Sequence, residues 1–224
     1  TDLVTIDGWP IQNAIKGHTG QISMQEVFTY SLNTGSIQAL RLLGGSETEL
    51  TYQGKEKLYD YYYNHFGLGK YTGIELAESK GIIVPPTDVD ATNARYANMT
   101  FGQSLDLTMI QVATAFSAVV NGGDYYTPTL VAGEVKNGEF FKKQLKERDH
   151  QAIESSTSET MRKMLHQARL VFPNVKTYDD GVYVGGKTGT AQVVKNGKYT
   201  FDETIATYVG FGARSETDYP EYVI

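Results

Sequence analysis

Apolar residues at helical spacing dominate the first half of the chain. Ser23 and Glu26 form a capping-box pattern, which predicts a helix that runs to about residue 30. A second helix is expected over residues 36–43, before a Gly-Gly pair. A third helix, ending near residue 67, carries its apolar and aromatic side chains on one face, at Leu58, Tyr61, Tyr62 and His65.

Two later helices differ in their polarity. Thr108 and Gln111 form a second capping box, and residues 112–120 are apolar nearly all round, which predicts a buried helix. Ser156 and Glu159 predict the start of the last helix, whose apolar side chains fall on one face, as an amphipathic surface helix requires: Met161, Met164, Leu165 and Ala168.

Strand patterns come late in the chain. A short hairpin is expected over residues 134–140 around Asn137-Gly138, because a type I′ turn needs two positive φ angles. A longer hairpin is expected between residues 182–194 and 199–207, around Asn196-Gly197, and residues 207–213 either extend its second side or begin a third strand. Residues 82–96 are expected to form a long surface loop. The fold class is therefore α+β: an antiparallel sheet with buried and flanking helices, in one domain over residues 1–224.

Composition and charge exclude several classes of function. The chain has 224 residues, 40% hydrophobic and 21% charged, which is ordinary for a globular domain. Its net charge is −6, and its one short basic cluster, in residues 142–148, is broken by Gln144 and Glu147, so no nucleic-acid partner is expected. The absence of Cys excludes disulfides and a thiolate nucleophile, and the four His have no metal-ligand spacing. No metal or other cofactor is expected. No apolar run is long enough for a membrane helix.

The most informative stretch is residues 185–192, Gly-Gly-Lys-Thr-Gly-Thr-Ala-Gln. Glycines weaken a strand unless another backbone or a ligand must approach closely, so this strand is expected to face a ligand. Lys187 supplies positive charge, and Thr188 and Thr190 supply hydroxyl groups, a combination suited to binding a carboxylate. The alternative interpretation is a Gly-rich edge strand with an exposed Lys.

A second candidate is Ser31-x-Asn33, at the expected end of the first helix. A hydroxyl that passes a proton and an amide that both donates and accepts suit an acyl-transfer site. By itself the pair is weak, because Asn33 is also a common residue at a helix C-terminus.

Together the two motifs resemble the penicillin-recognising serine transferases, whose further motif, Ser-x-x-Lys, carries the nucleophile. The resemblance extends over about residues 7–212 to the class B penicillin-binding proteins. It rests on landmarks in that family's order: Phe66-Gly67-Leu68-Gly69, Thr72-Gly73-Ile74-Glu75-Leu76 with Glu78, Gly102-Gln103, Thr108 with Gln111, Asn121-Gly122-Gly123 before Pro128, and Gly186 through Gln192.

The resemblance implies roles on both sides of a catalytic cleft. On the helical side, Ser31 would relay a proton near the nucleophile, and Asn33 would bind the substrate amide. On the strand side, Lys187 would lend positive charge to the cleft, and Thr190 would supply a backbone N–H to the oxyanion hole. The implied substrate-binding residues on that strand are Thr188, Gly189 and Gln192.

The chain also departs from the family pattern. No Ser-x-x-Lys occurs in it; the nearest approach, Thr160-Met161-Arg162-Lys163, comes too late in the family's order. The nucleophile and its share of the oxyanion hole are therefore expected to lie upstream, so the chain is expected to be part of a transpeptidase domain, incomplete at both ends and inactive alone. Exposed sheet edges or apolar patches, and self-association through them, are expected where the other segments pack. Leu32 and Ser104 are smaller departures, outside the implied chemistry.

The implied activity is that of a peptidoglycan D,D-transpeptidase, which cross-links stem peptides through a serine acyl-enzyme and is a target of β-lactams. Members are anchored in the bacterial cytoplasmic membrane with this domain outside it, and work beside a glycosyltransferase and the division or elongation proteins. Two alternatives remain open: a β-lactamase or D,D-carboxypeptidase on the same fold, in which water replaces the amine, and a non-catalytic scaffolding member.

Overall fold

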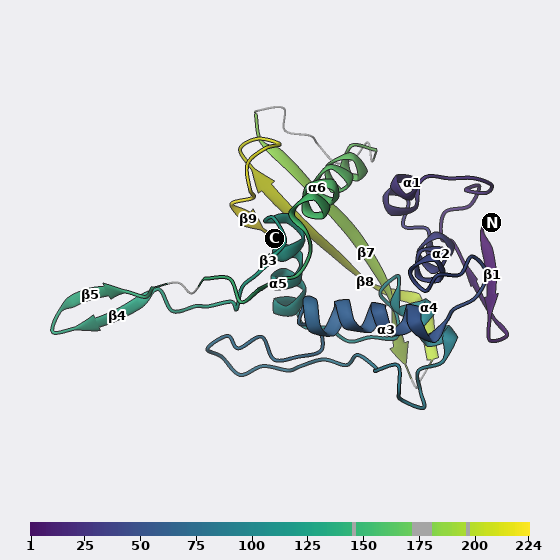
Figure 1. Ribbon diagram of the computed structural model, residues 1–224, viewed down its shortest axis with the longest axis horizontal. Coiled ribbons are helices and arrows are strands. Elements are labelled where there is room, and N and C mark those ends of the chain that lie inside the picture. The colour runs from purple at the N-terminus through teal and green to yellow at the C-terminus, as the bar shows by residue number, and fades with distance from the viewer. Residues whose placement is uncertain (145–146, 172–180, 196–197) are drawn as a thin grey trace.

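The computed structural model describes residues 1–144, 147–171, 181–195 and 198–224. Its helices and antiparallel strands form a mixed α+β fold, as the sequence predicted (Figure 1). In chain order the elements are β1 (Leu3–Ile6), β2 (Trp9–Gln12), α1 (Met24–Thr29), α2 (Asn33–Leu43), α3 (Tyr52–Asp60), the π-helix η1 (Tyr61–His65), α4 (Asn93–Met99), α5 (Met109–Val120), β3 (Asp124–Tyr125), β4 (Gly133–Lys136), β5 (Glu139–Lys142), β6 (His150–Gln151), α6 (Ser155–Leu170), β7 (Tyr183–Lys195), β8 (Lys198–Ala213) and β9 (Tyr222–Val223).

The N-terminal part of the chain packs around α2 and α4. Ile37 on α2 and Ala97 on α4 are fully buried against the β1–β2 hairpin, which the sequence patterns did not predict. Tyr96 is also fully buried, and its hydroxyl donates to the carbonyl of Val84 over 2.8 Å. This hydrogen bond attaches the irregular segment before α4 to the core.

Two boundaries predicted in this part are wrong. The second helix begins at Asn33 rather than at residue 36, because Leu32 is fully buried and pins the chain where α2 starts. The expected loop over residues 82–96 ends early, since Thr92 caps α4 by accepting a hydrogen bond from the backbone N–H of Arg95. The long irregular segment therefore precedes α4.

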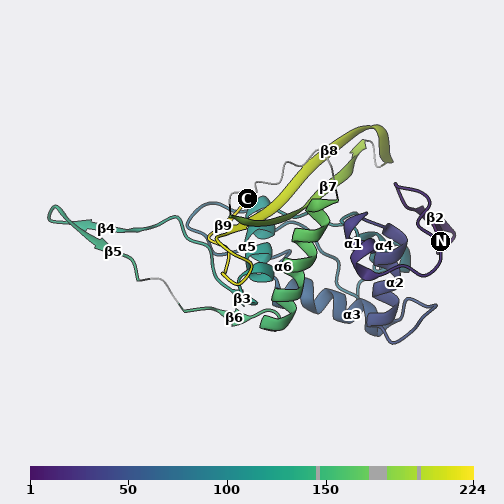
Figure 2. The ribbon, with the colours of Figure 1, turned by 90° about the horizontal axis from the view of Figure 1, so that it is seen from above.

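The C-terminal part forms a second core between two helices and a sheet. Phe211 on β8 is only 4% exposed and packs with Val120 of α5 and Leu165 of α6. The sheet has the order β7-β8-β9 and is antiparallel throughout, with Tyr183 opposite Ala213 at one end of the long hairpin. Figure 2 shows this ribbon lying across α5 and α6.

The Thr108–Gln111 capping box at the start of α5 is confirmed. The buried Gln111 amide also donates to the carbonyls of Lys70 and Lys80, so it joins two loop segments to the helix. The prediction that residues 112–120 are buried is wrong in part, because Val112 is 37% exposed and Ala113 lines an open hollow beside β9.

The predicted cap of the last helix is also wrong. Helix α6 begins at Ser155, and its N-cap, Glu154, makes no side-chain hydrogen bond to the helix. Glu159 instead pairs with Lys163 one turn later, at 3.2 Å. The predicted amphipathic face is present, since Leu165 and Ala168 are buried.

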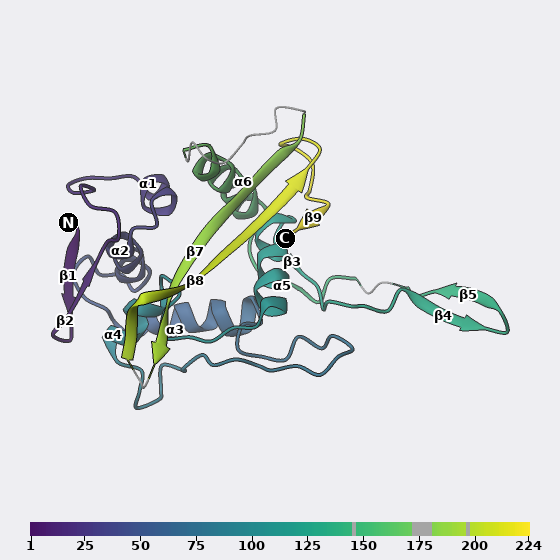
Figure 3. The same ribbon diagram turned by 180° about the vertical axis from the view of Figure 1, so that it is seen from behind.

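The two predicted hairpins have very different surroundings. The long one forms as β7 and β8, and residues 207–213 extend β8; the predicted turn at residues 196–197 lies outside the described residues. The short one forms as β4 and β5 around Asn137 and Gly138, whose φ angles are 52° and 82°. It stands at the end of two extended segments, well away from the helices, in all three views (Figures 1–3). We call residues 126–144 and 147–149 the arm.

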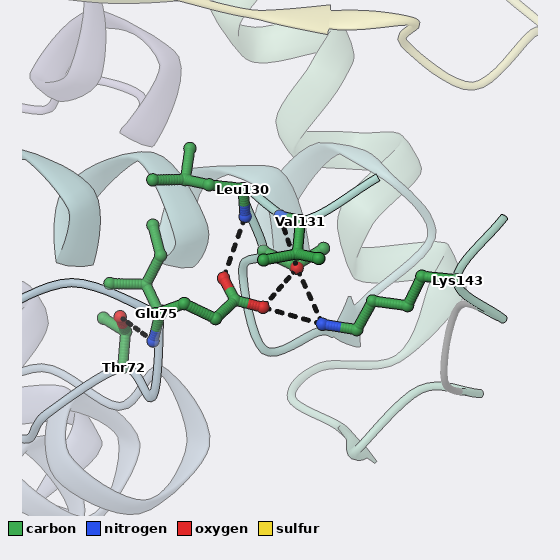
Figure 4. Close-up of polar contacts among 7 residues, drawn as sticks. Thr72, Glu75, Leu130, Val131 and Lys143 are labelled. Carbon is green, nitrogen blue, oxygen red and sulfur yellow. Dashed lines mark hydrogen bonds and ion pairs between the residues drawn. The ribbon is translucent and has the colours of Figure 1, made fainter. Parts of the chain in front are cut away.

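A polar cluster centred on Glu75 holds the base of the arm (Figure 4). The Glu75 carboxylate accepts hydrogen bonds from the Thr129 hydroxyl and the Leu130 N–H and forms an ion pair with Lys143 at 2.7 Å. These hydrogen bonds, that from Lys143 first, lower the pKa of Glu75 to about 2. The cluster therefore joins both sides of the arm to the segment before α4.

None of the helices among the described residues is long and apolar enough to cross a bilayer.

Candidate active site

Ser31 lies directly after the C-cap of α1, at the end of a helix as the sequence suggested, and its N–H donates to the carbonyl of Phe28 in the last turn. Its φ is +51°, in the left-handed region that non-glycine residues enter at a cost of about 1 kcal/mol or more. The neighbouring Leu32 side chain is fully buried, while Ser31 is exposed. The local sequence thus holds the Ser31 side chain out of the core.

The structure brings Ser31 together with Lys187, which comes from β7, 156 residues further along the chain. The Lys187 Nζ donates a short hydrogen bond to the Ser31 hydroxyl and a second one, of 3.1 Å, to the carbonyl of Thr188. Partial burial lowers the pKa of Lys187, because desolvation disfavours the charged ammonium. The two residues therefore form a hydroxyl–ammonium pair that spans the helix side and the strand side.

Strand β7 presents the other strand-side residues at the edge of the sheet. It pairs with β8 on one side and, among the described residues, with no strand on the other. Thr188 and Thr190 are exposed and, because side chains alternate along a strand, lie on the face opposite Lys187. Because no described strand covers this edge, an extended ligand can pair with its backbone and contact the two hydroxyls.

Gly189 has a structural explanation besides ligand access. A Cβ at this position would lie 2.6 Å from the Thr207 hydroxyl oxygen on β8, too close for an ordinary contact. The glycine therefore allows β7 and β8 to pair with Thr207 opposite it.

Asn33 is held by the N-terminal hairpin. Its side-chain nitrogen donates to the carbonyl of Gln12 on β2 over 2.9 Å. The next residue, Thr34, is held in the same way: its N–H donates to the Asn13 side chain over 3.0 Å, and its hydroxyl donates to the carbonyl of Thr1 over 2.8 Å. The start of α2 is thus attached to β2, and the structure does not bring the Asn33 amide to Lys187.

The side chain of Gln192 forms a hydrogen bond with the side chain of Gln103. Its Oε1 accepts a hydrogen bond of 3.4 Å from Nε2 of Gln103, in the segment between α4 and α5. Sequence reasoning noted Gln103 only as a landmark and gave it no role. The contact lies next to the shift in the β7–β8 register between Gln192 and Val194.

His18 is a residue near this site that no motif singled out. Its ring packs against that of Tyr30 in a tilted arrangement, with centroids 4.3 Å apart, and Tyr30 directly precedes Ser31. Only the tertiary structure reveals this pair, since the two residues lie in different segments without a recognisable spacing.

The titratable side chains near the Ser31–Lys187 pair limit the chemistry that it can perform. In the part of the chain that the structure describes, no three His, Asp or Glu side chains lie close enough together to hold a metal ion. The chemistry available at the Ser31–Lys187 pair is proton transfer and electrostatic stabilisation by a cation.

A model of the penicillin binding protein transpeptidase domain matches residues 2–224. The chain belongs to this family. Within the family it is similar to the stage V sporulation protein D of Bacillus subtilis (34% identical over 97% of this chain and 32% of that protein) and to the penicillin-binding protein PbpB of Mycobacterium tuberculosis (28% identical over 88% and 28%). The resemblance to class B penicillin-binding proteins is thereby confirmed. The chain spans about a third of the length of these relatives.

Solved structures support the transpeptidase fold. Penicillin-binding protein 3 of Mycobacterium tuberculosis, in complex with ampicillin, matches with a TM-score of 0.79 at 24% identity, over 99% of this chain and 48% of that one. A structure described as a putative peptidoglycan glycosyltransferase from Atopobium parvulum matches with a TM-score of 0.74 at 26% identity, over 99% and 50%. The predicted transpeptidase-like α+β fold is confirmed.

Proposed function

We propose that residues 1–224 form part of the catalytic domain of a peptidoglycan D,D-transpeptidase. The observation that carries the proposal is the hydrogen bond between Lys187 and Ser31, which joins the strand motif to the helix-side motif of a chain in the transpeptidase family. Names of relatives agree with the activity: PenA of Neisseria flavescens, 25% identical, is a probable peptidoglycan D,D-transpeptidase.

In this proposal the nucleophile is a serine outside these residues, in a Ser-x-x-Lys motif. Its oxygen attacks the carbonyl carbon of the penultimate D-Ala in a stem peptide, and the C–N bond to the terminal D-Ala breaks. The amine of a neighbouring stem then attacks the ester and releases the serine. A β-lactam acylates the same serine by opening its ring. No metal or other cofactor takes part.

Ser31 and Lys187 serve proton transfer in this scheme. The Ser31 hydroxyl passes a proton toward the departing amine of D-Ala, and the Lys187 ammonium beside it favours the form of Ser31 that has given up its proton. Partial burial of Lys187 strengthens this electrostatic effect, since charges interact more strongly away from bulk water.

The edge of β7 binds the substrate in the same scheme. Thr188 and Thr190 hydroxyls bind the substrate carboxylate, and the Thr190 N–H donates to the oxyanion. Such a donor is worth about 3–4 kcal/mol in acyl transfer. Gly189 keeps this edge open, and Gln192, held by Gln103, fixes the end of the strand. Asn33 binds the substrate amide once its side chain leaves the Gln12 carbonyl.

The parent protein, on this proposal, is anchored in the bacterial cytoplasmic membrane with this domain on the extracytoplasmic side. Its substrates are D-Ala-D-Ala stem peptides, its inhibitors are β-lactams, and it works beside a glycosyltransferase and proteins of division or elongation. Membership of the penicillin-binding protein family supports this setting.

The test is intact-protein mass spectrometry after incubation with benzylpenicillin. We expect an adduct on a longer chain that includes the Ser-x-x-Lys and none on residues 1–224. In the longer chain, Ser31→Gly and Lys187→Met are expected to slow acylation about 100-fold or more. Ser31→Gly removes the hydroxyl while accommodating the positive φ, so its effect is not due to backbone strain.

Lys142→Ala is the matched control, because Lys142 is an exposed lysine on β5, in the arm. It should leave the acylation rate unchanged. A longer chain that is folded but forms no adduct would overturn the proposal and favour a non-catalytic role, and rapid release of the bound penicillin would favour a β-lactamase.

A further inference from the structure

The tip of the arm exposes apolar side chains that no other part of the described chain covers. Val135 is 71% exposed, and Phe140 and Phe141 are also exposed. Val135 and Phe140 are cross-strand partners on one face of the hairpin, and Glu134 and Phe141 are partners on the other. An isolated two-stranded hairpin is marginally stable in water, and unpaired edges readily accept another strand. The arm thus has the composition of a contact element.

The direction of the backbone N–H and C=O groups determines which residues of β4 can pair with a further strand. The Ala132 carbonyl accepts a hydrogen bond from the N–H of Lys143, so the backbone groups of residue 132 point toward β5. Because these groups alternate along an antiparallel strand, those of Glu134 and Lys136 also point inward, and those of Val135 point outward. Val135 is therefore available for pairing with a second strand.

The charges that flank Val135 complement a second copy of the same strand. In an antiparallel pair centred on Val135, each Glu134 lies opposite Lys136 of the other copy, on the same face of the sheet. The two side chains already share a face within one chain, where they form an ion pair of 2.8 Å. Opposite charges directly across two strands stabilise their pairing.

The edge of β5 lacks this complementarity. By the same alternation Phe140 is its outward residue, and pairing two copies about Phe140 would place Glu139 opposite Phe141. Pairing about Lys142 would place two ammonium groups opposite each other, which is unfavourable. The β4 edge is therefore the one suited to self-recognition.

We propose that two copies of this chain associate through β4, antiparallel and centred on Val135, into a four-stranded sheet related by a twofold axis. One face of that sheet carries a continuous apolar stripe of Phe140, Val135 and their counterparts, and the other carries two Glu134–Lys136 pairs. Such an interface is isologous, because each copy contributes the same surface. It is small, so the dimer is weak and depends on protein concentration. This association is independent of the proposed catalytic function.

Sedimentation velocity over a series of concentrations tests the proposal on the 224-residue chain. We expect a monomer–dimer equilibrium that Val135→Pro abolishes. Proline removes only the outward N–H at this edge position, so the β4–β5 hydrogen bonds remain. A chain that stays monomeric at every concentration, or a dimer that survives Val135→Pro unchanged, would overturn the proposal.

A charge exchange tests the register. Glu134→Lys and Lys136→Glu should each raise the dimer dissociation constant about tenfold, since like charges then face each other across the axis. An equimolar mixture of the two single variants, and the double variant alone, should restore the original affinity. Equal affinities for all of these proteins would contradict the register, because association by another surface would ignore these charges.

Discussion

The hairpins β7–β8 and β4–β5 have opposite character. In β7–β8 the strands run for 13 and 16 residues, and Phe211 is buried against α5 and α6. In β4–β5 each strand has 4 residues, all of them exposed except the half-buried Gly133. Both obey the same rules of antiparallel pairing. The difference shows that local sequence determines strand pairing, whereas stability depends on whether a helical layer covers one face.

The largest expected effect is a difference in the free energy of unfolding between substitutions at two phenylalanines, one in each hairpin. Phe211→Ala should lower the free energy of unfolding by about 3–5 kcal/mol, because it leaves a cavity between α5, α6 and β8. Phe140→Ala should change it by about 0.5 kcal/mol or less, since the ring is 58% exposed on the arm. Urea denaturation monitored by circular dichroism measures both. Similar losses from the two variants would contradict the distinction between the hairpins.

The next effect concerns the contact between β7 and α6. A Cβ on Gly185 would lie 2.5 Å from the Phe211 ring and 2.9 Å from the backbone nitrogen of His166. Gly185→Ala should therefore separate helix and sheet and destabilise the protein by about 1–3 kcal/mol, measurable as a lower urea midpoint. Gly212→Ala on β8 is the control, because its Cβ would meet only Val184 at 3.8 Å, an ordinary contact.

A smaller effect is expected at the turn of the arm. Gly138 has a φ of 82°, so Gly138→Ala should destabilise the hairpin locally by about 1 kcal/mol. Amide hydrogen exchange should become faster in β4 and β5 while the global urea midpoint stays the same. A matching fall of the global midpoint would mean that the arm unfolds together with the body.

The smallest effect is a pH dependence at the base of the arm. The pKa of Glu75 is lowered to about 2, so the folded state favours its carboxylate form. The stabilisation it gives is complete above about pH 4.5, the ordinary value, and is lost as the pH falls toward 2. The protection factor of the Leu130 amide, which is its exchange rate relative to the intrinsic rate at the same pH, should fall over this interval. Glu75→Gln should show low protection at all pH values, and an unchanged profile in that variant would assign the effect to another carboxylate.

Sequence patterns predicted the features that depend on short stretches of chain. The capping boxes at Ser23 and Thr108 and the turn at Asn137 are present because their hydrogen bonds or dihedral angles involve residues a few positions apart. The apparent cap at Ser156 failed because α6 already begins at Ser155, so that Ser156 lies inside the helix.

The site was predictable only in part. Lys187 and Ser31 were found through motifs, and the structure brings them into contact. The contacts of Asn33 with Gln12 and of Gln192 with Gln103 were not predictable, since each joins segments whose separation along the chain follows no period. The same holds for the exposed face of α5, because an apolar helix does not reveal which side its neighbours cover.

The Ser31–Lys187 contact has a consequence for the order of folding. Its two residues are 156 positions apart, and Lys187 reaches Ser31 only when β7 has docked beside α6 and α6 has docked beside α1. Closing so long a loop carries a large entropic barrier, and contacts of this range form slowly. The hydroxyl–ammonium pair is therefore expected to assemble late in folding, after each helix cluster has collapsed, so that a newly made chain becomes compact before Lys187 contacts Ser31.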